Sequence, residues 1–164
     1  MRIVTDCENC GAAMRLAESG GYLFCEYCTS LRFVSETDEG VVASGAGSGE
    51  HCPACRVELK AASVEGQDVS YCDRCRGILL KSAVFRQVID ARIKRGCSRE
   101  APNRIADDEA LARTISCPRC RVEMSRHPYY GPGDAVIDCC GECLLLWLDH
   151  PELTVIVKAH QQRR

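Results

Sequence analysis

Residues 117–143 are CPRCRVEMSRHPYYGPGDAVIDCCGEC, a segment that begins and ends with a Cys-x-x-Cys motif. On a tight turn, such a motif places two sulfurs on one metal ion, each about 2.3 Å from it. A second motif that returns after a hairpin of roughly 15–20 residues supplies two more ligands and completes a tetrahedron. The segment therefore predicts a small hairpin fold organised around a metal ion.

The same arrangement occurs three times along the chain. Twelve of the fourteen cysteines form six Cys-x-x-Cys motifs, and the gaps within successive pairs of motifs are 14, 16 and 19 residues. The gaps between the pairs are longer, at 23 and 41 residues. This pattern predicts three repeats. The predicted ligands are Cys7, Cys10, Cys25 and Cys28, then Cys52, Cys55, Cys72 and Cys75, then Cys117, Cys120, Cys140 and Cys143.

These cysteines are predicted to hold three zinc ions per chain rather than to form disulfides. The segment before Cys7 lacks the basic and apolar stretches of a signal peptide, so we expect a cytoplasmic protein with reduced thiols. No apolar run reaches the length of a membrane span. Two alternatives stay open. One is an iron site of rubredoxin type, and the other is a set of redox dithiols, although no βαβ pattern surrounds the motifs.

The spacing predicts a small, metal-dominated α+β protein of three tandem zinc ribbons. A unit below about 40 residues rarely buries a sufficient core, so zinc is expected to hold each ribbon together. In chain order we expect ribbon 1 at residues 1–34, a flexible linker rich in Gly, Ser and acids at 35–50, ribbon 2 with a helix at 51–96, a polar linker at 97–112, and ribbon 3 with a helix at 113–160.

A basic helix is predicted after the second repeat, from a cap at Ser82 to Arg95, with an apolar stripe of Val84, Phe85, Val88 and Ile89. Its outer face would contact phosphates if the middle unit binds nucleic acid, through Arg86, Arg92, Lys94 and Arg95. The overall charge argues against strong binding. Four thiolates and one Zn²⁺ carry −2, so three sites take the formal charge from −2 to −8. Residues 45–105 alone are basic, at +4.

The third repeat combines a capping pattern with a long apolar run. Asp149 and Glu152 predict the start of a helix that extends to about His160, with Leu153, Ile156 and Val157 on its apolar face. Residues 144–148 are Leu-Leu-Leu-Trp-Leu, which as a strand has two apolar faces. One helix covers one face, so we expect the other to meet a second copy of the chain or another protein. The alternative is that the helix of the second repeat covers it.

The second and third repeats resemble the family of transcription-factor-IIB-type zinc fingers. The family pattern is C-P-x-C, a Leu or Met four residues on, a hairpin, C-x-x-C, Gly-x-Trp-x-Asp and Glu-Leu at the start of a helix. The third repeat matches at Cys117-Pro118-Arg119-Cys120, Met124, Cys140, Cys143, Trp147, Asp149, Glu152 and Leu153, with Leu145 in place of Gly. The second matches at Cys52-Pro53-Ala54-Cys55, Leu59, Cys72, Cys75 and Gly77, with Leu79 for Trp and Lys81 for Asp. The first repeat resembles only a generic zinc ribbon.

The remaining candidate residues are expected to have minor roles. Cys140 is preferred over Cys139 as a ligand because it keeps the Cys-x-x-Cys spacing, and Cys97 is interpreted as a linker thiol. Trp147 is expected to pack the third helix on its ribbon. The histidines are interpreted as surface residues: His51, His127, His150 and His160.

The expected function is that of a binding module rather than an enzyme. A catalytic zinc keeps an open position for water, which four thiolates do not leave. The sequence also contains no nucleophile motif and no phosphate-binding loop. We expect a scaffold for an unidentified protein, in transcription or another macromolecular complex. Nucleic-acid binding through the basic unit and a thiol redox role are the alternatives.

Overall fold

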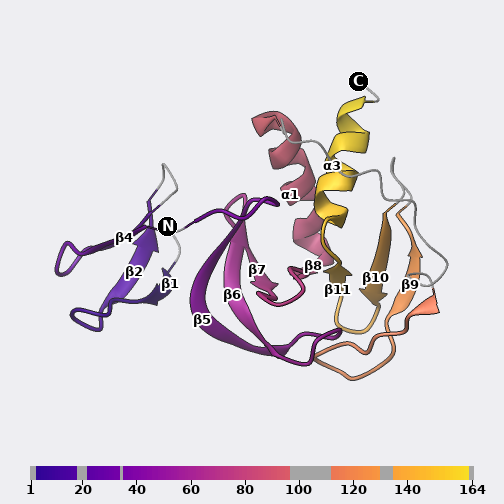
Figure 1. Ribbon diagram of the computed structural model, residues 1–164, viewed down its shortest axis with the longest axis horizontal. Helices are drawn as coiled ribbons and strands as arrows, with labels where there is room; N and C mark the ends of the chain where they lie inside the picture. Colours follow the sequence, from indigo (N-terminus) through magenta and orange to yellow (C-terminus); the bar gives the residue numbers. More distant parts are fainter. Residues whose placement is uncertain (1–2, 18–21, 34, 97–111, 130–134, 163–164) are drawn as a thin grey trace.

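The computed structural model describes residues 3–17, 22–33, 35–96, 112–129 and 135–162. Within them the chain forms two antiparallel sheets and two helices (Figure 1). The expected linker at 97–112 lies outside the described residues apart from Ala112, and so does Cys97. No helix in the described ranges is both long enough and apolar enough to cross a membrane.

Ribbon 1 is a small sheet held mainly around its own cysteines. Its strands are β1 (Ile3–Asp6), β2 (Ala13–Leu16), β3 (Tyr22–Cys25) and β4 (Leu31–Phe33), which lie side by side in that order. Its buried cluster consists of Cys7, Met14, Leu23 and Cys25. Figure 1 shows this sheet beside the main body, next to β5. Since the described cluster contains so few apolar residues, we expect ribbon 1 to depend on its metal for stability.

Ribbons 2 and 3 share one seven-stranded sheet of order β5-β6-β7-β8-β11-β10-β9. Ribbon 2 supplies β5 (Val41–His51), β6 (Glu58–Val64), β7 (Gln67–Tyr71) and β8 (Ile78–Lys81). Ribbon 3 supplies β9 (Ser125–Pro128), β10 (Val136–Cys140) and β11 (Leu145–Leu148). The two repeats therefore form one continuous sheet rather than two separate units.

Residues 35–50, expected to be a flexible linker, instead contain most of β5. This strand pairs with β6 from Val41↔Val64 to His51↔Glu58, with irregularities between. The small residues of this strand have local structural roles. The Ser44 hydroxyl donates to the Ala61 carbonyl at 2.8 Å, and Gly45 and Gly49 adopt positive φ angles at the irregularities. A composition typical of linkers here permits an irregular strand.

The strand pair β8–β11 joins the two ribbons. Leu79 pairs with Trp147, Leu80 with Leu146, and Ile78 with Leu148. Leu79 and Trp147 each lie seven residues after the first cysteine of the preceding motif, Cys72 or Cys140. Equivalent positions thus face each other, and the ribbons are related by a local two-fold axis through the Leu79–Trp147 pair.

Two helices cover one face of this sheet, α1 (Ser82–Arg95) and α3 (Glu152–Gln162), and they pack against each other (Figure 1). The predicted apolar faces of both helices lie in a core of 17 buried residues. Phe85, Val88 and Ile89 contribute from α1, and Leu153, Ile156 and Val157 from α3. The fused unit therefore has the apolar core that a single ribbon lacks.

The apolar run of the third repeat is covered within the chain. Leu146 and Leu148 face the helices, whereas Leu145 and Trp147 face the zinc side of the sheet. Leu145 is 2% exposed and Leu146 6%. The expectation that residues 144–148 present an open apolar face for self-association or a partner is therefore wrong for Leu145–Leu148, whereas Leu144 is 64% exposed. The run is covered within the chain, but not by the helix of the second repeat on its second face. Both helices lie on the side of Leu146 and Leu148, and the side of Leu145 and Trp147 packs against the cysteine clusters and Leu79.

Two capping predictions need correction. Ser82 does not cap α1: it is the first helical residue, and its hydroxyl donates to the Leu144 carbonyl of ribbon 3 at 3.1 Å. At α3 the Glu152 carboxylate accepts from the Asp149 N–H at 2.8 Å, as a capping box requires. The Asp149 carboxylate accepts instead from the indole N–H of Trp147 at 2.9 Å, so half of the box forms.

Candidate metal centres

Each Cys-x-x-Cys motif forms the same tight turn. In the motifs that begin at Cys7, Cys25, Cys52, Cys72 and Cys117, the N–H of the residue after the second cysteine donates to the carbonyl of the first, as in Arg56 to Cys52 at 2.9 Å and Arg121 to Cys117 at 2.9 Å. That following residue has a left-handed backbone in all six turns, at Gly11, Thr29, Arg56, Arg76, Arg121 and Leu144. Only the first is glycine, so five non-glycine residues adopt a conformation that is uncommon for them. The turn geometry that aims both sulfurs at one point therefore recurs throughout the chain.

The turns bring the twelve cysteines together in the groups expected from the spacing. The four sulfurs of each group lie within 4.8 Å of one another. The Cys7 and Cys28 sulfurs are 3.5 Å apart, those of Cys52 and Cys75 are 3.6 Å apart, and those of Cys120 and Cys140 are 3.5 Å apart. Tetrahedral zinc with sulfur ligands at about 2.3 Å requires sulfurs about 3.8 Å apart. The groups fit one zinc ion each, and no described cysteine forms a disulfide.

Hydrogen bonds to sulfur favour the thiolate form that zinc requires at Cys28 and Cys120, whereas burial and the neighbouring Cys75 raise the pKa of Cys55 to about 11. The N–H of Cys55 donates to the Cys52 sulfur at 3.2 Å. The Ser30 hydroxyl donates to the Cys28 sulfur at 3.0 Å and lowers the pKa of that thiol to about 5. A backbone hydrogen bond from Val122 lowers the pKa of Cys120 to about 7. Donors to sulfur favour the charged form.

The sites differ in what surrounds them. The second and third sites share an apolar cluster that also contains Leu79 and Trp147. In the first site Cys10 is exposed, and the buried apolar neighbours are Met14 and Leu23. Sites 2 and 3 are therefore built into the fused unit, whereas site 1 is close to solvent.

Trp147 lies on the zinc side of the sheet and does not pack against α3, which corrects its expected role. Its ring covers Gly77 of the second ribbon, where a Cβ would collide with it. The two-fold equivalent of Gly77 is Leu145, and that of Trp147 is Leu79. Each ribbon keeps one residue of the Gly-x-Trp pattern and replaces the other: ribbon 2 has Gly77 and Leu79, and ribbon 3 has Leu145 and Trp147. The two replacements compensate each other in space. The large Trp faces Gly77, and the smaller Leu79 leaves room for Leu145.

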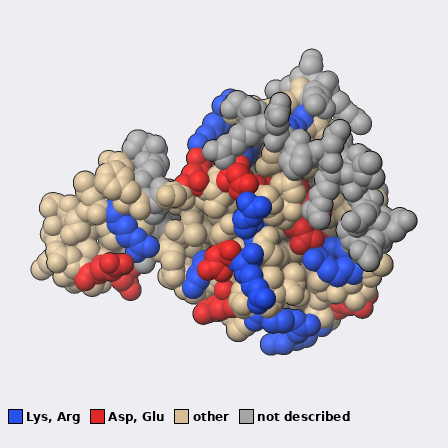
Figure 2. All heavy atoms as spheres, viewed as in Figure 1, with Lys and Arg blue, Asp and Glu red and all other residues tan. Residues whose placement is uncertain are grey.

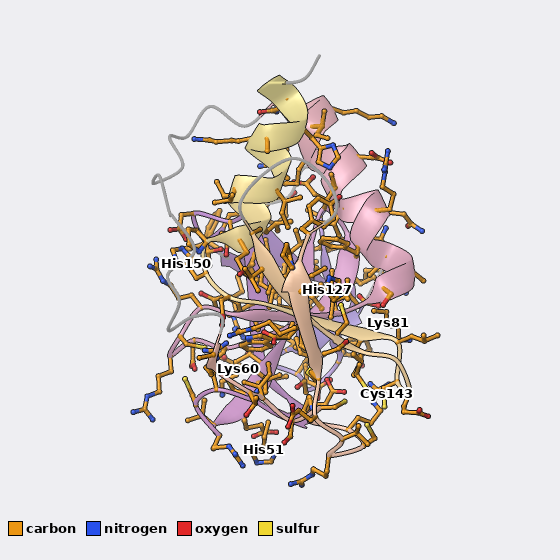
Figure 3. All side chains as sticks on the ribbon, turned by 90° about the vertical axis from the view of Figure 1, so that its right-hand side faces the viewer. His51, Lys60, Lys81, His127, Cys143 and His150 are labelled. Atoms are coloured by element: carbon orange, nitrogen blue, oxygen red, sulfur yellow. The ribbon has the colours of Figure 1, made fainter. Side chains whose placement is uncertain are left out.

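The remaining cysteine and the histidines lie outside the metal groups. Cys140 is in the third group, and Cys139 instead points its sulfur at the His127 ring, 3.2 Å from Nε2. Burial raises the pKa of Cys139 to about 11. Figure 3 shows that His51, His127 and His150 are spread over one side of the molecule and do not gather near Cys143. No histidine joins the cysteine clusters found in the described residues.

The basic face of α1 is largely neutralised. Arg86 pairs with Asp90 at 3.0 Å, and Arg95 donates two hydrogen bonds of 2.8 Å to Glu36. Arg92, expected on the outer face, is 8% exposed and pairs with Glu65 at 3.5 Å. Of the four candidate phosphate contacts, Arg86, Lys94 and Arg95 are exposed, and the two arginines among them are paired with carboxylates. The structure thus brings acids from outside the helix to its basic face, which the sequence pattern of the helix did not indicate.

A group of buried carboxylates near the start of α3 also escaped the sequence analysis. Glu39 accepts from the Thr154 N–H at 3.1 Å, and burial raises its pKa to about 7. Burial and the nearby Asp149 charge raise the pKa of Glu152 to about 8. Asp138, bound by Arg126 at 2.9 Å, has a pKa raised by burial. Glu39 therefore ties the segment after ribbon 1 to α3, whereas Glu152 and Asp138 hold elements of ribbon 3 together.

Residues 51–91 match the model of a family described as transcription factor zinc-finger. The second ribbon matches this zinc-ribbon family. The matched segment runs from the end of β5 into α1 and includes the whole second group of ligands. No curated protein and no solved structure matches the chain. Taken with the three groups of four cysteines, the match identifies a zinc-binding protein that holds three zinc ions per chain.

Proposed function

We propose that the protein is a non-catalytic, cytoplasmic module that binds another protein and uses its three zinc ions for structure. The observation that carries this proposal is the closed ligand set, because four sulfurs lie within 4.8 Å of one another at every site. A catalytic zinc usually has three protein ligands and an open position for water or substrate. Four thiolates complete a tetrahedron and leave none.

The distribution of exposed apolar side chains supports a protein partner. Of the five exposed large apolar residues in the part of the chain that the structure describes, three lie on ribbon 1: Tyr27, Leu31 and Phe33, at 83%, 60% and 81% exposure. Figure 2 shows few charged side chains on much of the viewed surface of this unit. Grouped apolar residues of this kind tend to mark contact sites. The description of the family matched by ribbon 2 names transcription factors, which supports a partner from a transcription-related assembly.

Nucleic-acid binding through α1 is the weaker candidate. The guanidinium groups of Arg86, Arg92 and Arg95 are paired with carboxylates, and a phosphate would have to displace those partners. A thiol redox role is weaker still, because twelve cysteines are committed to zinc. Both candidates are less consistent with the described side chains than a protein-binding role.

Affinity capture with the zinc-loaded protein tests the proposal, with Cys139→Ser as the control that removes a cysteine outside the metal groups. We expect the native protein and the control to retain the same proteins after nuclease treatment. Cys7→Ser/Cys10→Ser, which dismantles ribbon 1, is expected to lose them. Capture that disappears with nuclease, or with Lys94→Ala/Arg95→Ala, would favour nucleic-acid binding. If the native protein captures no protein specifically, the proposal is contradicted.

A further inference from the structure

In ribbons 2 and 3, the strand that follows the second cysteine motif is paired with another ribbon. These strands are β8 and β11, and they pair with each other. The corresponding strand of ribbon 1 is β4, which lies at the edge of its sheet. Counted from the first cysteine of the motif, Leu31 and Phe33 hold the positions of Ile78 and Leu80 in ribbon 2. β4 is therefore a third copy of the ribbon-joining strand, without a neighbour on its outer side in the described structure.

The environment of β4 differs sharply from that of its equivalents. Ile78 and Leu80 are buried in the main core, as are their equivalents in β11. Leu31 and Phe33 are mostly exposed. In ribbons 2 and 3 a helix follows the strand and covers it, whereas the next described element after β4 is β5. The apolar character of the strand is retained in ribbon 1, but its cover is missing.

The apolar surface of ribbon 1 extends across the neighbouring strand. Tyr22 pairs with Phe33 across β3 and β4, with ring centroids 6.2 Å apart, and Phe24 pairs with Leu31. With Tyr27 on the adjacent turn, four of the nine aromatic residues of the chain lie in this smallest unit. They line one face of its last two strands or the adjoining turn.

The backbone of β4 is arranged for a further strand. In an antiparallel sheet the N–H and C=O groups of alternate residues point to opposite sides. The Cys25 N–H donates to the Ser30 carbonyl at 2.9 Å, so Arg32 bonds toward β3, and the backbone groups of Leu31 and Phe33 point to the open edge. Ile78 and Leu80 use the equivalent groups to bind β11, and the same register continues where the Ser82 N–H donates to the Leu144 carbonyl at 2.9 Å.

We propose that β4 pairs with β4 of a second copy of the chain, antiparallel and about a two-fold axis at Arg32. The register of β8–β11 then predicts Leu31 of one copy opposite Phe33 of the other, and Arg32 opposite Arg32. We assign a second copy of the chain as the partner of β4 because the chain already pairs equivalent strands about a two-fold axis, in β8 and β11. The interaction extends the proposed binding role, yet it does not depend on it, since a module without a foreign partner still dimerises in this way.

The area available is sufficient for a weak dimer. An aromatic side chain buries about 150–250 Å² when fully covered. Two copies of Tyr27, Leu31 and Phe33 together expose at most roughly 1,000 Å², which is the upper limit of what these side chains can remove from water and lies near the lower limit of specific interfaces. Each Arg32 is also paired with Glu8 at 3.3 Å and donates to the Ser44 carbonyl at 2.9 Å, which reduces repulsion between the two facing guanidinium groups. Both copies of ribbon 1 carry a net negative charge and repel each other. Added salt screens this repulsion and should strengthen the dimer.

Sedimentation equilibrium of the zinc-loaded full chain across the micromolar range tests the proposal. We expect a monomer–dimer equilibrium, and Leu31→Lys should weaken it about tenfold or more, since an edge lysine opposes strand pairing. Leu144→Lys is the matched control. It places the same change on an exposed leucine of ribbon 3 and should leave the equilibrium within about twofold of native. Three zinc ions per chain in each variant would show that ribbon 1 is still folded.

Amide hydrogen exchange tests the register itself. On raising the protein concentration, exchange at Leu31 and Phe33 should slow, whereas exchange at Arg32, already bonded within its own sheet, should not change. A native chain that stays monomeric, a dimer unaffected by Leu31→Lys, or slowed exchange at Arg32 without Leu31 and Phe33 would overturn the proposal. A monomer that still captures a foreign protein would leave the binding role standing and remove the self-pairing alone.

Discussion

Ribbon 1 and the fused pair of ribbons 2 and 3 begin from the same cysteine pattern but are stabilised differently. Among the side chains that the structure describes, the buried cluster of ribbon 1 contains Met14 and Leu23 beside its ligands. The fused unit adds a core of 17 buried residues under two helices. The difference arises at one strand position, which is paired and covered in ribbons 2 and 3 and open in ribbon 1. In this chain, the two ribbons whose last strands pair with each other share a hydrophobic core.

The largest expected difference concerns the loss of zinc. Cys7→Ser/Cys10→Ser should abolish binding at site 1 and unfold ribbon 1, because a structural zinc site supplies on the order of 10 kcal/mol and this unit has little else. The fused unit should keep two zinc ions and its helices. Elemental analysis with circular dichroism measures both, and Cys139→Ser is the control that should retain three ions. Loss of all three ions from the double variant would show that the two regions do not fold independently.

Substitution at equivalent positions of the two regions should have very different effects on stability. Leu80→Ala removes a buried side chain between the ribbons and should lower the free energy of unfolding by about 2–5 kcal/mol. Phe33→Ala, at the same position of ribbon 1, should change it by less than about 0.5 kcal/mol, since the side chain is exposed. Denaturant unfolding at low protein concentration gives both values. Equal costs would mean that Phe33 is buried in solution.

A pH-dependent difference is expected where the two regions meet. The pKa of Glu39 is raised from its ordinary value to about 7 by burial, so the folded state favours the neutral acid. The contribution of this group is fully present below pH about 4.5 and is lost as the pH rises through about 7. Glu39→Gln should therefore gain about 2 kcal/mol relative to native between pH 5.5 and 8. Unfolding free energies of both proteins at the two pH values measure this, and a constant difference would contradict it.

The smallest effect tests the compensation between Gly77 and Trp147. Gly77→Ala should destabilise the native chain, because the new methyl group meets the indole ring. In a Trp147→Leu background the same change should cost about 1 kcal/mol less. Gly141→Ala, whose Cβ would have no neighbour within 4 Å, is the control and should be close to neutral in both backgrounds. An additive double variant would show that the two positions are not coupled.

Much of the candidate site could be predicted because its information is local. Each Cys-x-x-Cys motif forms its turn from adjacent residues, so spacing alone indicates which cysteines meet and why Cys140 is a ligand and Cys139 is not. The apolar stripes of the helices follow from their period in the same way. Arg92 departs from this pattern because its partner, Glu65, lies at the turn between β6 and β7, far from the helix in sequence.

The sequence by itself determined the three zinc sites, the ribbon turns, and the helices after ribbons 2 and 3. Only the tertiary structure decided that residues 41–51 form a strand, that β8 pairs with β11, and that Trp147 lies over Gly77. A strand whose two faces are both apolar, such as residues 145–148, can be covered by any apolar neighbour, so its sequence does not specify which one. The choice depends on long-range pairing, and it leaves β4 as the one ribbon-joining strand in the described residues with an open edge.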